Sequence, residues 1–78
     1  KEQPLGFWMK DMHFPLDIIW LNSHWQIVHV EQNLTPCANI STCRGYTPSE
    51  NAQYVVEVNA GFVKSNQIKL GDQFTLMQ

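Results

Sequence analysis

The side chains that could carry chemistry in this sequence are mainly histidines and carboxylates in its first half. Apart from two cysteines, the possible metal ligands are His13, Asp17, His24, His29 and Glu31. His29 and Glu31 stand two residues apart, so both would point to the same side of an extended strand and could face one ion. Two ligands do not make a site, and neither an HxH nor an HExxH motif is present. The pair is a weak metal candidate, and we expect no cofactor.

Nucleophilic catalysis has little support in the sequence. Ser41, Ser49 and Ser65 are not embedded in the G-x-S-x-G motif that places a serine nucleophile on a sharp turn. A reduced Cys43 would be a nucleophile candidate, because the positive charge of the neighbouring Arg44 favours the thiolate.

The two cysteines are better explained as a disulfide. Cys37 and Cys43 lie six residues apart, which is not the CxxC spacing of a redox or zinc site. In a small domain such a pair favours a local disulfide, and a disulfide favours an extracytoplasmic location. Closing this loop of seven residues would stabilise the fold by about 2.4 kcal/mol. The alternative is a pair of reduced, buried thiols in a cytosolic protein.

Charged and aromatic residues supply the remaining ligand-binding candidates. Lys10, Asp17 and Glu57 stand inside or beside apolar stretches. Because a buried charge needs a partner, we expect Lys10 to pair with one of the carboxylates; the alternative is that the three line a polar pocket. Trp25 stands where a turn meets a strand and Tyr46 stands in a loop, so these two could stack against a ligand.

The pattern of β-branched and apolar residues predicts a mainly β fold. Strands are expected over 6–10, 17–21, 25–32, 53–58 and 73–77, and the second and third of these form a hairpin. Asn59 is expected to cap a short helix over 60–66. The intervening 33–51 is predicted to be one long loop, a kind of segment that is often functional. Asn33, at its start, is therefore a further ligand-binding candidate.

Size and charge exclude several classes of protein. The 78 residues form one domain at most, over 1–78, and a net charge of −2 without any basic run disfavours binding to nucleic acid. No apolar stretch approaches the roughly 20 residues that span a bilayer, so no membrane span is expected. The sequence begins with Lys1, which suggests that a preceding segment has been removed.

Four groups of residues together resemble one family. They are Phe7-Trp8-Met9-Lys10 with Pro15-Leu16-Asp17-Ile18; Glu31, Asn33, Pro36 and Cys37; Tyr54 to Gly61; and Leu70-Gly71-Asp72. Their order and approximate spacing are similar to those of the domain of unknown function 192 family. The resemblance covers nearly the whole chain.

The resemblance implies an all-β fold, a small jelly-roll-like barrel or sandwich with one short helix. It also implies a prokaryotic protein, since members occur in bacteria and archaea, many with a signal peptide or membrane anchor. No activity is established for the family, so the resemblance supplies a fold and leaves function open. Members carry additional strands before the Phe-Trp-Met-Lys motif, so we expect an N-terminally incomplete domain with an open sheet edge. Such an edge would pair with the missing segment or with a second copy.

The sequence leaves three functions open. The first is a binding or accessory module of the cell envelope that contacts its ligand through 33–51 and nearby aromatic residues, since loops on a rigid scaffold often carry function. The second is a small hydrolase or metal-dependent enzyme that uses His29, Glu31 and Asp17. The third is a structural piece of a larger assembly.

Overall fold

A central three-stranded antiparallel sheet organises the fold. The computed structural model of the chain describes residues 6–9, 12–37, 43 and 45–74. The sheet has the order β3-β2-β5, with β2 over Leu16–Leu21, β3 over Ile27–Leu34 and β5 over Tyr54–Asn59. Every residue of β2 is buried, as its largely apolar sequence predicts for a central strand, and Asp17 is its one charged residue. The hairpin of β2 and β3 is confirmed by their antiparallel register.

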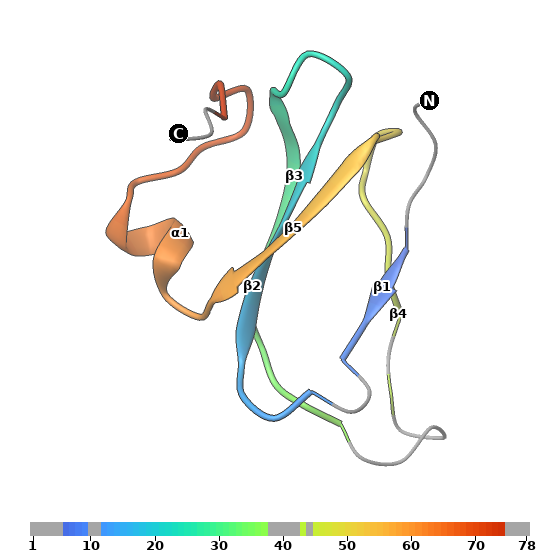
Figure 1. Cartoon of the computed structure of the whole chain (residues 1–78), viewed down its shortest axis with the longest axis vertical. Coiled ribbons are helices and arrows are strands. Elements are labelled where there is room, and N and C mark those ends of the chain that lie inside the picture. Colours follow the sequence, from blue (N-terminus) through green and yellow to red (C-terminus); the bar gives the residue numbers. More distant parts are fainter. Residues whose placement is uncertain (1–5, 10–11, 38–42, 44, 75–78) are drawn as a thin grey trace.

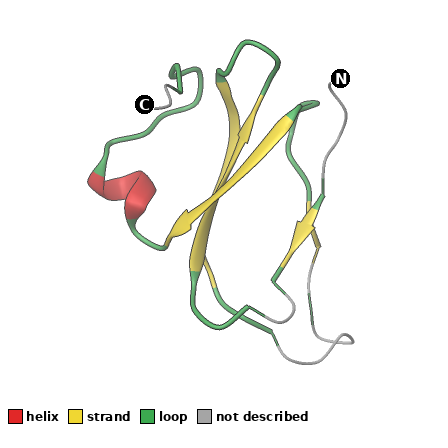
Figure 2. Cartoon of the chain, in the orientation of Figure 1, coloured by secondary structure: helices red, strands yellow, loops and turns green. Residues whose placement is uncertain are grey.

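The two faces of this sheet are covered by different elements. A small second sheet pairs β1 (Phe7–Trp8) with β4 (Gly45–Tyr46), and the short helix α1 spans Phe62–Ser65. In Figures 1 and 2 the β1–β4 pair and α1 lie on opposite sides of the central sheet. Because side chains alternate along β2, it contributes to two apolar clusters. The cluster on the β1–β4 side contains Met9, Leu16, Ile18, Trp20, Leu34 and Ala52. The cluster on the α1 side contains Ile19, Leu21, Ile27 and Val63.

The predicted fold class is confirmed, but closure into a barrel is not found. The described residues are mainly strand with a single short helix. Among them, β1 and β4 pair only with each other, so the two sheets stay separate and do not close. A jelly-roll arrangement is therefore not confirmed.

Several element boundaries differ from the sequence-based expectation. The third strand starts at Ile27 instead of residue 25, because Trp25 has a φ of 64° and belongs to the turn. The expected loop over 33–51 contains the end of β3 and all of β4. Of the expected strand over 73–77, Gln73 forms an isolated bridge with Gln26, and residues 75–77 lie outside the described part.

The expected cap of the helix is also wrong. Asn59 is the last residue of β5, and the N-cap position belongs to Gly61, whose φ of 95° favours glycine. The N-cap residue makes no side-chain hydrogen bond to the first turn of the helix. No helix in the described ranges is long and apolar enough to cross a membrane.

Candidate functional site

A polar cluster lies where β3 meets the segment before β5. His29 Nε2 is 2.9 Å from Glu31 Oε2, so the two side chains lie on the same side of β3, as their spacing predicts. On the other edge of the imidazole, Nδ1 lies 3.3 Å from Ser49 Oγ and accepts the Ser49 backbone N–H at 3.3 Å. His29 and Glu31 side chains are 21% and 32% exposed, so solvent reaches both.

The sheet fixes the position of the imidazole. Trp20 is the direct partner of His29 across β2 and β3, and it is fully buried. The indole and imidazole rings meet edge to face, with centroids 5.1 Å apart and planes at 71°. One side of His29 therefore rests on a rigid core residue, which favours a single ring orientation.

The hydrogen bonds assign the proton on His29. The Ser49 backbone N–H can only donate, so Nδ1 must act as acceptor in this arrangement. The neutral ring then carries its proton on Nε2, which donates to the Glu31 carboxylate. The cluster thus combines a carboxylate, an oriented imidazole whose Nδ1 lone pair accepts a backbone N–H, and a hydroxyl within reach of the same nitrogen.

The described residues around His29 do not supply enough ligands for a metal site. In the described ranges no group of three or more His, Cys, Asp and Glu side chains comes together. Among the described residues, His29 and Glu31 remain two possible ligands without a third, as in the sequence analysis.

Asp17 has a structural environment and does not join this cluster. It is fully buried on the α1 side of the sheet, whereas Trp20 and His29 face the β1–β4 side. Its Oδ1 accepts the Asn33 N–H at 2.9 Å, and its Oδ2 accepts the N–H groups of Gly61 at 3.1 Å and Val63 at 2.9 Å. Three backbone donors thereby satisfy a buried charge. Asp17 therefore cannot act together with His29 and Glu31, as the hydrolase hypothesis requires.

The other ligand-binding candidates are spread over the molecule. The backbone N–H of Asn33 donates to the Asp17 carboxylate, and the Glu57 side chain is exposed on β5. Tyr46 packs against the cluster on the β1–β4 side, whereas Trp25 packs against the cluster on the α1 side. The two aromatic candidates thus lie on opposite faces of the sheet and do not share a site. Lys10 and its expected ion pair lie outside the described residues.

Trp25 is already stacked within the protein. Its indole lies 4.5 Å from the Tyr54 ring at 19° and 6.5 Å from the Phe74 ring at 17°. At these distances the Tyr54 ring occupies indole surface that a ligand would need for stacking.

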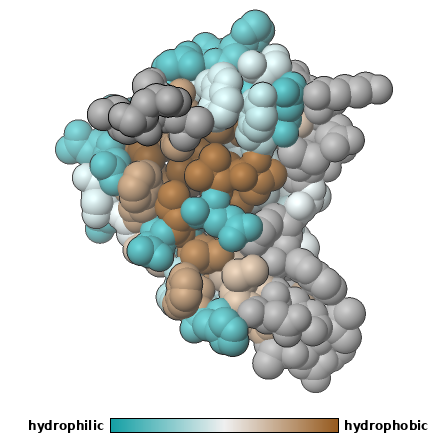
Figure 3. Space-filling model, in the orientation of Figure 1, coloured by the Kyte–Doolittle hydropathy of each residue, from teal (hydrophilic) through white to brown (hydrophobic). Residues whose placement is uncertain are grey.

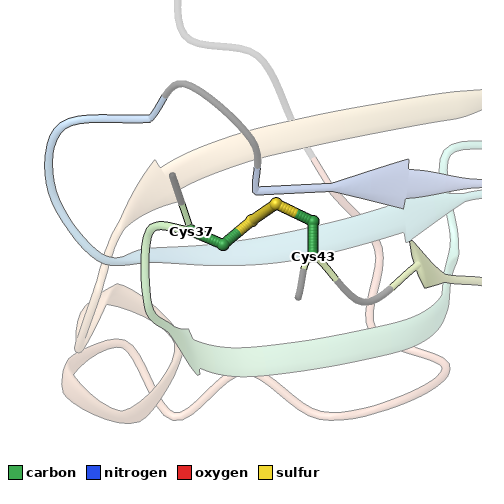
Figure 4. Close-up of a disulfide and its surroundings, with 2 residues drawn as sticks. All are labelled: Cys37 and Cys43. Atoms are coloured by element: carbon green, nitrogen blue, oxygen red, sulfur yellow. A yellow bond between two sulfur atoms is a disulfide. The ribbon is translucent and has the colours of Figure 1, made fainter. Parts of the chain in front are cut away.

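The predicted disulfide is present, and a backbone hydrogen bond joins one of its cysteines to the end of the first strand. Cys37 and Cys43 are bonded, with Cα atoms 5.5 Å apart (Figure 4). The Cys37 N–H also donates to the Met9 carbonyl at 3.4 Å, just after β1. The disulfide therefore holds the segment that leads toward β4 close to the strand with which β4 pairs.

An open groove beside α1 is a feature that the sequence did not indicate. It encloses about 640 Å³ and is lined by Gln32, Val63, Lys64, Gln67, Ile68 and Lys69. Its floor is the buried Val63 and the half-buried Ile68, and its rim is polar. Ser49 was likewise missed as a site residue, because it lies 20 positions from His29 and no local motif surrounds it.

The fold and these contacts define a small antiparallel β domain whose helix is tethered by a buried carboxylate. The chain belongs to the domain of unknown function 192 family, described as an uncharacterized ACR, which matches residues 1–76. It is similar to a solved structure from Sinorhizobium meliloti 1021, provisionally described as a transcription regulator, with 30% identity and a TM-score of 0.83. The similarity covers 94% of this chain but 54% of that one, so the chain spans about half the length of its structural relative. No curated protein matches the sequence.

Proposed function

We propose that the chain is a binding or accessory module of the cell envelope, and that its ligand contacts residues 47–51. These five residues, Thr-Pro-Ser-Glu-Asn, lie within the connection that the sequence indicated, between β4 and β5. Four of them are exposed and carry hydrogen-bonding side chains: Thr47, Ser49, Glu50 and Asn51.

The observation that carries this proposal is the anchoring of the segment on both sides. Tyr46 precedes it, pairs with Phe7 and packs on the core, and the fully buried Ala52 follows it. In the middle, the Ser49 N–H donates to His29 on the sheet. A short polar segment held at three points loses little conformational entropy on binding, which favours recognition.

The envelope location rests on the disulfide. Stable disulfides are rare in the reducing cytosol and common in exported proteins, especially small ones. The Cys37–Cys43 bond supports export, and the same bond limits the freedom of the connection that carries residues 47–51.

Cell-wall glycan fragments are the first ligand class to test, because a polar ligand suits the exposed hydroxyl, carboxylate and amide groups of this segment. Amide chemical shifts would be followed by NMR while soluble fragments are added. We expect changes concentrated at 45–52 and on β3, and their loss in a double variant, Glu50→Ala with Asn51→Ala. Gln67→Ala, on the exposed rim of the groove beside α1, is the matched control. Shifts centred on that groove, or no shifts at all, would rule out the proposed site.

A second candidate function is that of a structural piece in an assembly, with a partner strand added to β5. Among the described residues β5 pairs with β2 alone, so the backbone groups on its other edge have no strand beside them. Val55, Val56 and Val58 are only half-buried, and Figure 3 shows hydrophobic surface gathered over this strand. Apolar side chains along an open edge favour pairing with another strand.

Hydrogen exchange distinguishes the two candidates. An unpaired β5 leaves alternate amides open to solvent, so about half of its N–H groups should exchange quickly. Protection of all of them, rising with protein concentration together with the sedimentation coefficient, would support assembly through β5. Fast exchange of the alternate amides at every concentration would exclude self-pairing at this edge.

A further inference from the structure

We propose that Ser49 is a nucleophile for acyl transfer from activated carboxylic esters, with His29 as its general base and Glu31 as a positioning residue. This activity goes beyond ligand binding by residues 47–51. It requires the Ser49 hydroxyl and the His29 ring, whereas the proposed binding function is tested at Glu50 and Asn51.

The three side chains stand in the order that nucleophilic catalysis needs. The Glu31 carboxylate lies 2.9 Å from one ring nitrogen of His29, and the Ser49 hydroxyl lies 3.3 Å from the other. A base oriented by a third group and within reach of a hydroxyl is the general signature of an activated serine. The ring nitrogens are used in the reverse sense to the common arrangement, since here Nδ1 faces the serine and Nε2 faces the carboxylate.

The surroundings keep this geometry while leaving the hydroxyl accessible. The buried Trp20 supports the imidazole from β2, and the carboxylate stands on the same strand as the ring. Ser49 is exposed, so an ester carbonyl can approach Oγ from solvent. A base fixed on a sheet and a nucleophile at the surface are compatible with substrate access.

The reaction proceeds through an acyl-serine. As Ser49 Oγ bonds to the ester carbonyl carbon, its proton passes to His29 Nδ1 and the carbonyl electron pair moves to oxygen. That pair returns as the carbon–oxygen bond to the leaving alcohol breaks, and the alcohol takes the proton from Nδ1. Water then attacks the acyl group, again giving its proton to Nδ1. The product is a carboxylic acid, the proton returns to Ser49 Oγ, and Glu31 stabilises the imidazolium in both halves.

The geometry also limits the substrate class. The Nδ1 lone pair is shared between the Ser49 hydroxyl and the Ser49 backbone N–H, each at 3.3 Å. A base whose lone pair is shared removes a proton less readily, so the leaving group must be a weakly basic alcohol. Phenyl-type esters meet this requirement, because their leaving group is a phenol. Fluorophosphonates lose fluoride, also a weakly basic leaving group, and report the nucleophile as a stable phosphonyl adduct.

The experiment is labelling of the oxidised chain with a fluorophosphonate probe, followed by intact mass and peptide mapping. We expect one adduct, on Ser49, and none on the Ser49→Ala variant, which keeps the backbone N–H to His29. His29→Gln should slow labelling by about 100-fold or more, the lower range for loss of a general base. Glu31→Gln should lower the maximal labelling rate and leave the probe concentration for half-maximal rate unchanged. If Glu31 had a merely structural role, its replacement would change that concentration as well.

Matched controls separate this site from general reactivity. Ser65→Ala and His24→Gln remove an exposed serine on α1 and an exposed histidine in the β2–β3 turn, and both should label like the parent chain. Circular dichroism of each variant checks that the fold is retained. No adduct on the parent chain, an adduct on another serine, or equal labelling rates in a folded His29→Gln variant would each overturn the proposal. Labelling of Ser49 in a parent chain whose amide shifts do not change on addition of glycan fragments separates this activity from the proposed binding function.

Discussion

The carboxylate of Asp17 accepts the backbone N–H of Val63 at 2.9 Å, although 46 residues separate the two in the sequence. Val63 belongs to the first turn of α1, whose N–H groups have no partner inside the helix. Asp17 therefore caps this helix from a neighbouring strand, and through Asn33 it also fastens the end of β3. One buried side chain thus joins three separate segments.

Replacement of Asp17 should unfold the chain or nearly so. Asp17→Ala leaves three backbone donors without their acceptor, and hydrogen bonds to a charged group contribute about 1.5–3 kcal/mol each. For three such bonds we expect a loss of about 4.5 kcal/mol or more, a large share of the total stability of a small domain. Asp17→Asn retains one acceptor oxygen but turns an amide N–H toward backbone donors, so we expect a loss of about 2–3 kcal/mol.

Urea unfolding followed by tryptophan fluorescence measures both changes. Glu57→Gln is the control, because Glu57 is an exposed carboxylate on β5 and its loss should change the free energy of unfolding by less than about 0.5 kcal/mol. Equal stability of Asp17→Ala and Glu57→Gln would show that the three contacts contribute nothing.

This relationship marks the limit of what the sequence could predict. The hairpin of β2 and β3 and the strand β5 follow from local runs of β-branched residues, which is why they were found. The partners of Asp17 are 16, 44 and 46 residues away, so no local pattern could reveal them. A charge suggests an opposite charge, so the sequence led to an ion pair between Lys10 and one of the carboxylates; Lys10 lies outside the described residues, and three backbone N–H groups donate to Asp17.

The same limit explains the missed strand and the missed site residue. β4 is two residues long and exists because the chain returns alongside β1, a contact that depends on tertiary structure. The contact between Ser49 and His29 likewise depends on tertiary structure, since the two residues are 20 positions apart. The cap was misplaced because Asn59 has a favourable side chain for that role, whereas the pairing of Asn59 with Leu16 continues β5 through this position.

Two glycines should respond in opposite ways to the same substitution. Gly61 has a φ of 95° and open space around its Cα, so Gly61→Ala introduces backbone strain without a steric clash. We expect a loss of about 1–2 kcal/mol. Gly45 lies in β4 with equally open space and no positive φ, so Gly45→Ala should stabilise by about 0.4–1 kcal/mol through the unfolded state. Thermal unfolding of the two variants, side by side, checks the signs; a shift of the same sign in both would refute the conformational argument.

Removal of the disulfide should destabilise the fold without rearranging the central sheet. The bond closes a loop of seven residues, and its loss in Cys37→Ser with Cys43→Ser should lower the free energy of unfolding by about 2.4 kcal/mol. The effect should be concentrated at β1 and β4, since the disulfide lies beside that pair, and β2, β3 and β5 should keep their amide protection. Hydrogen exchange with and without reductant measures this, and uniform loss of protection across the whole chain would contradict it.

Trp25 should prove to be a stabilising residue at the end of the sheet. Its ring stacks on Tyr54 at 4.5 Å. Its backbone N–H donates to the Asn22 carbonyl, and its backbone carbonyl accepts the Phe74 N–H at 2.7 Å. Trp25→Ala removes the ring contacts but keeps both backbone bonds, so we expect a loss of about 2–3 kcal/mol, below the range for fully buried tryptophan.

Trp25→Phe, which retains an aromatic ring against Tyr54, should lose no more than about half as much. The control is Phe14→Ala, since Phe14 is 56% exposed and its removal should cost less than about 0.5 kcal/mol. Chemical denaturation followed by circular dichroism avoids dependence on the tryptophan signal. If Trp25→Ala is as stable as Phe14→Ala, the aromatic stack contributes no stability. Trp25 would then again be a candidate for ligand binding.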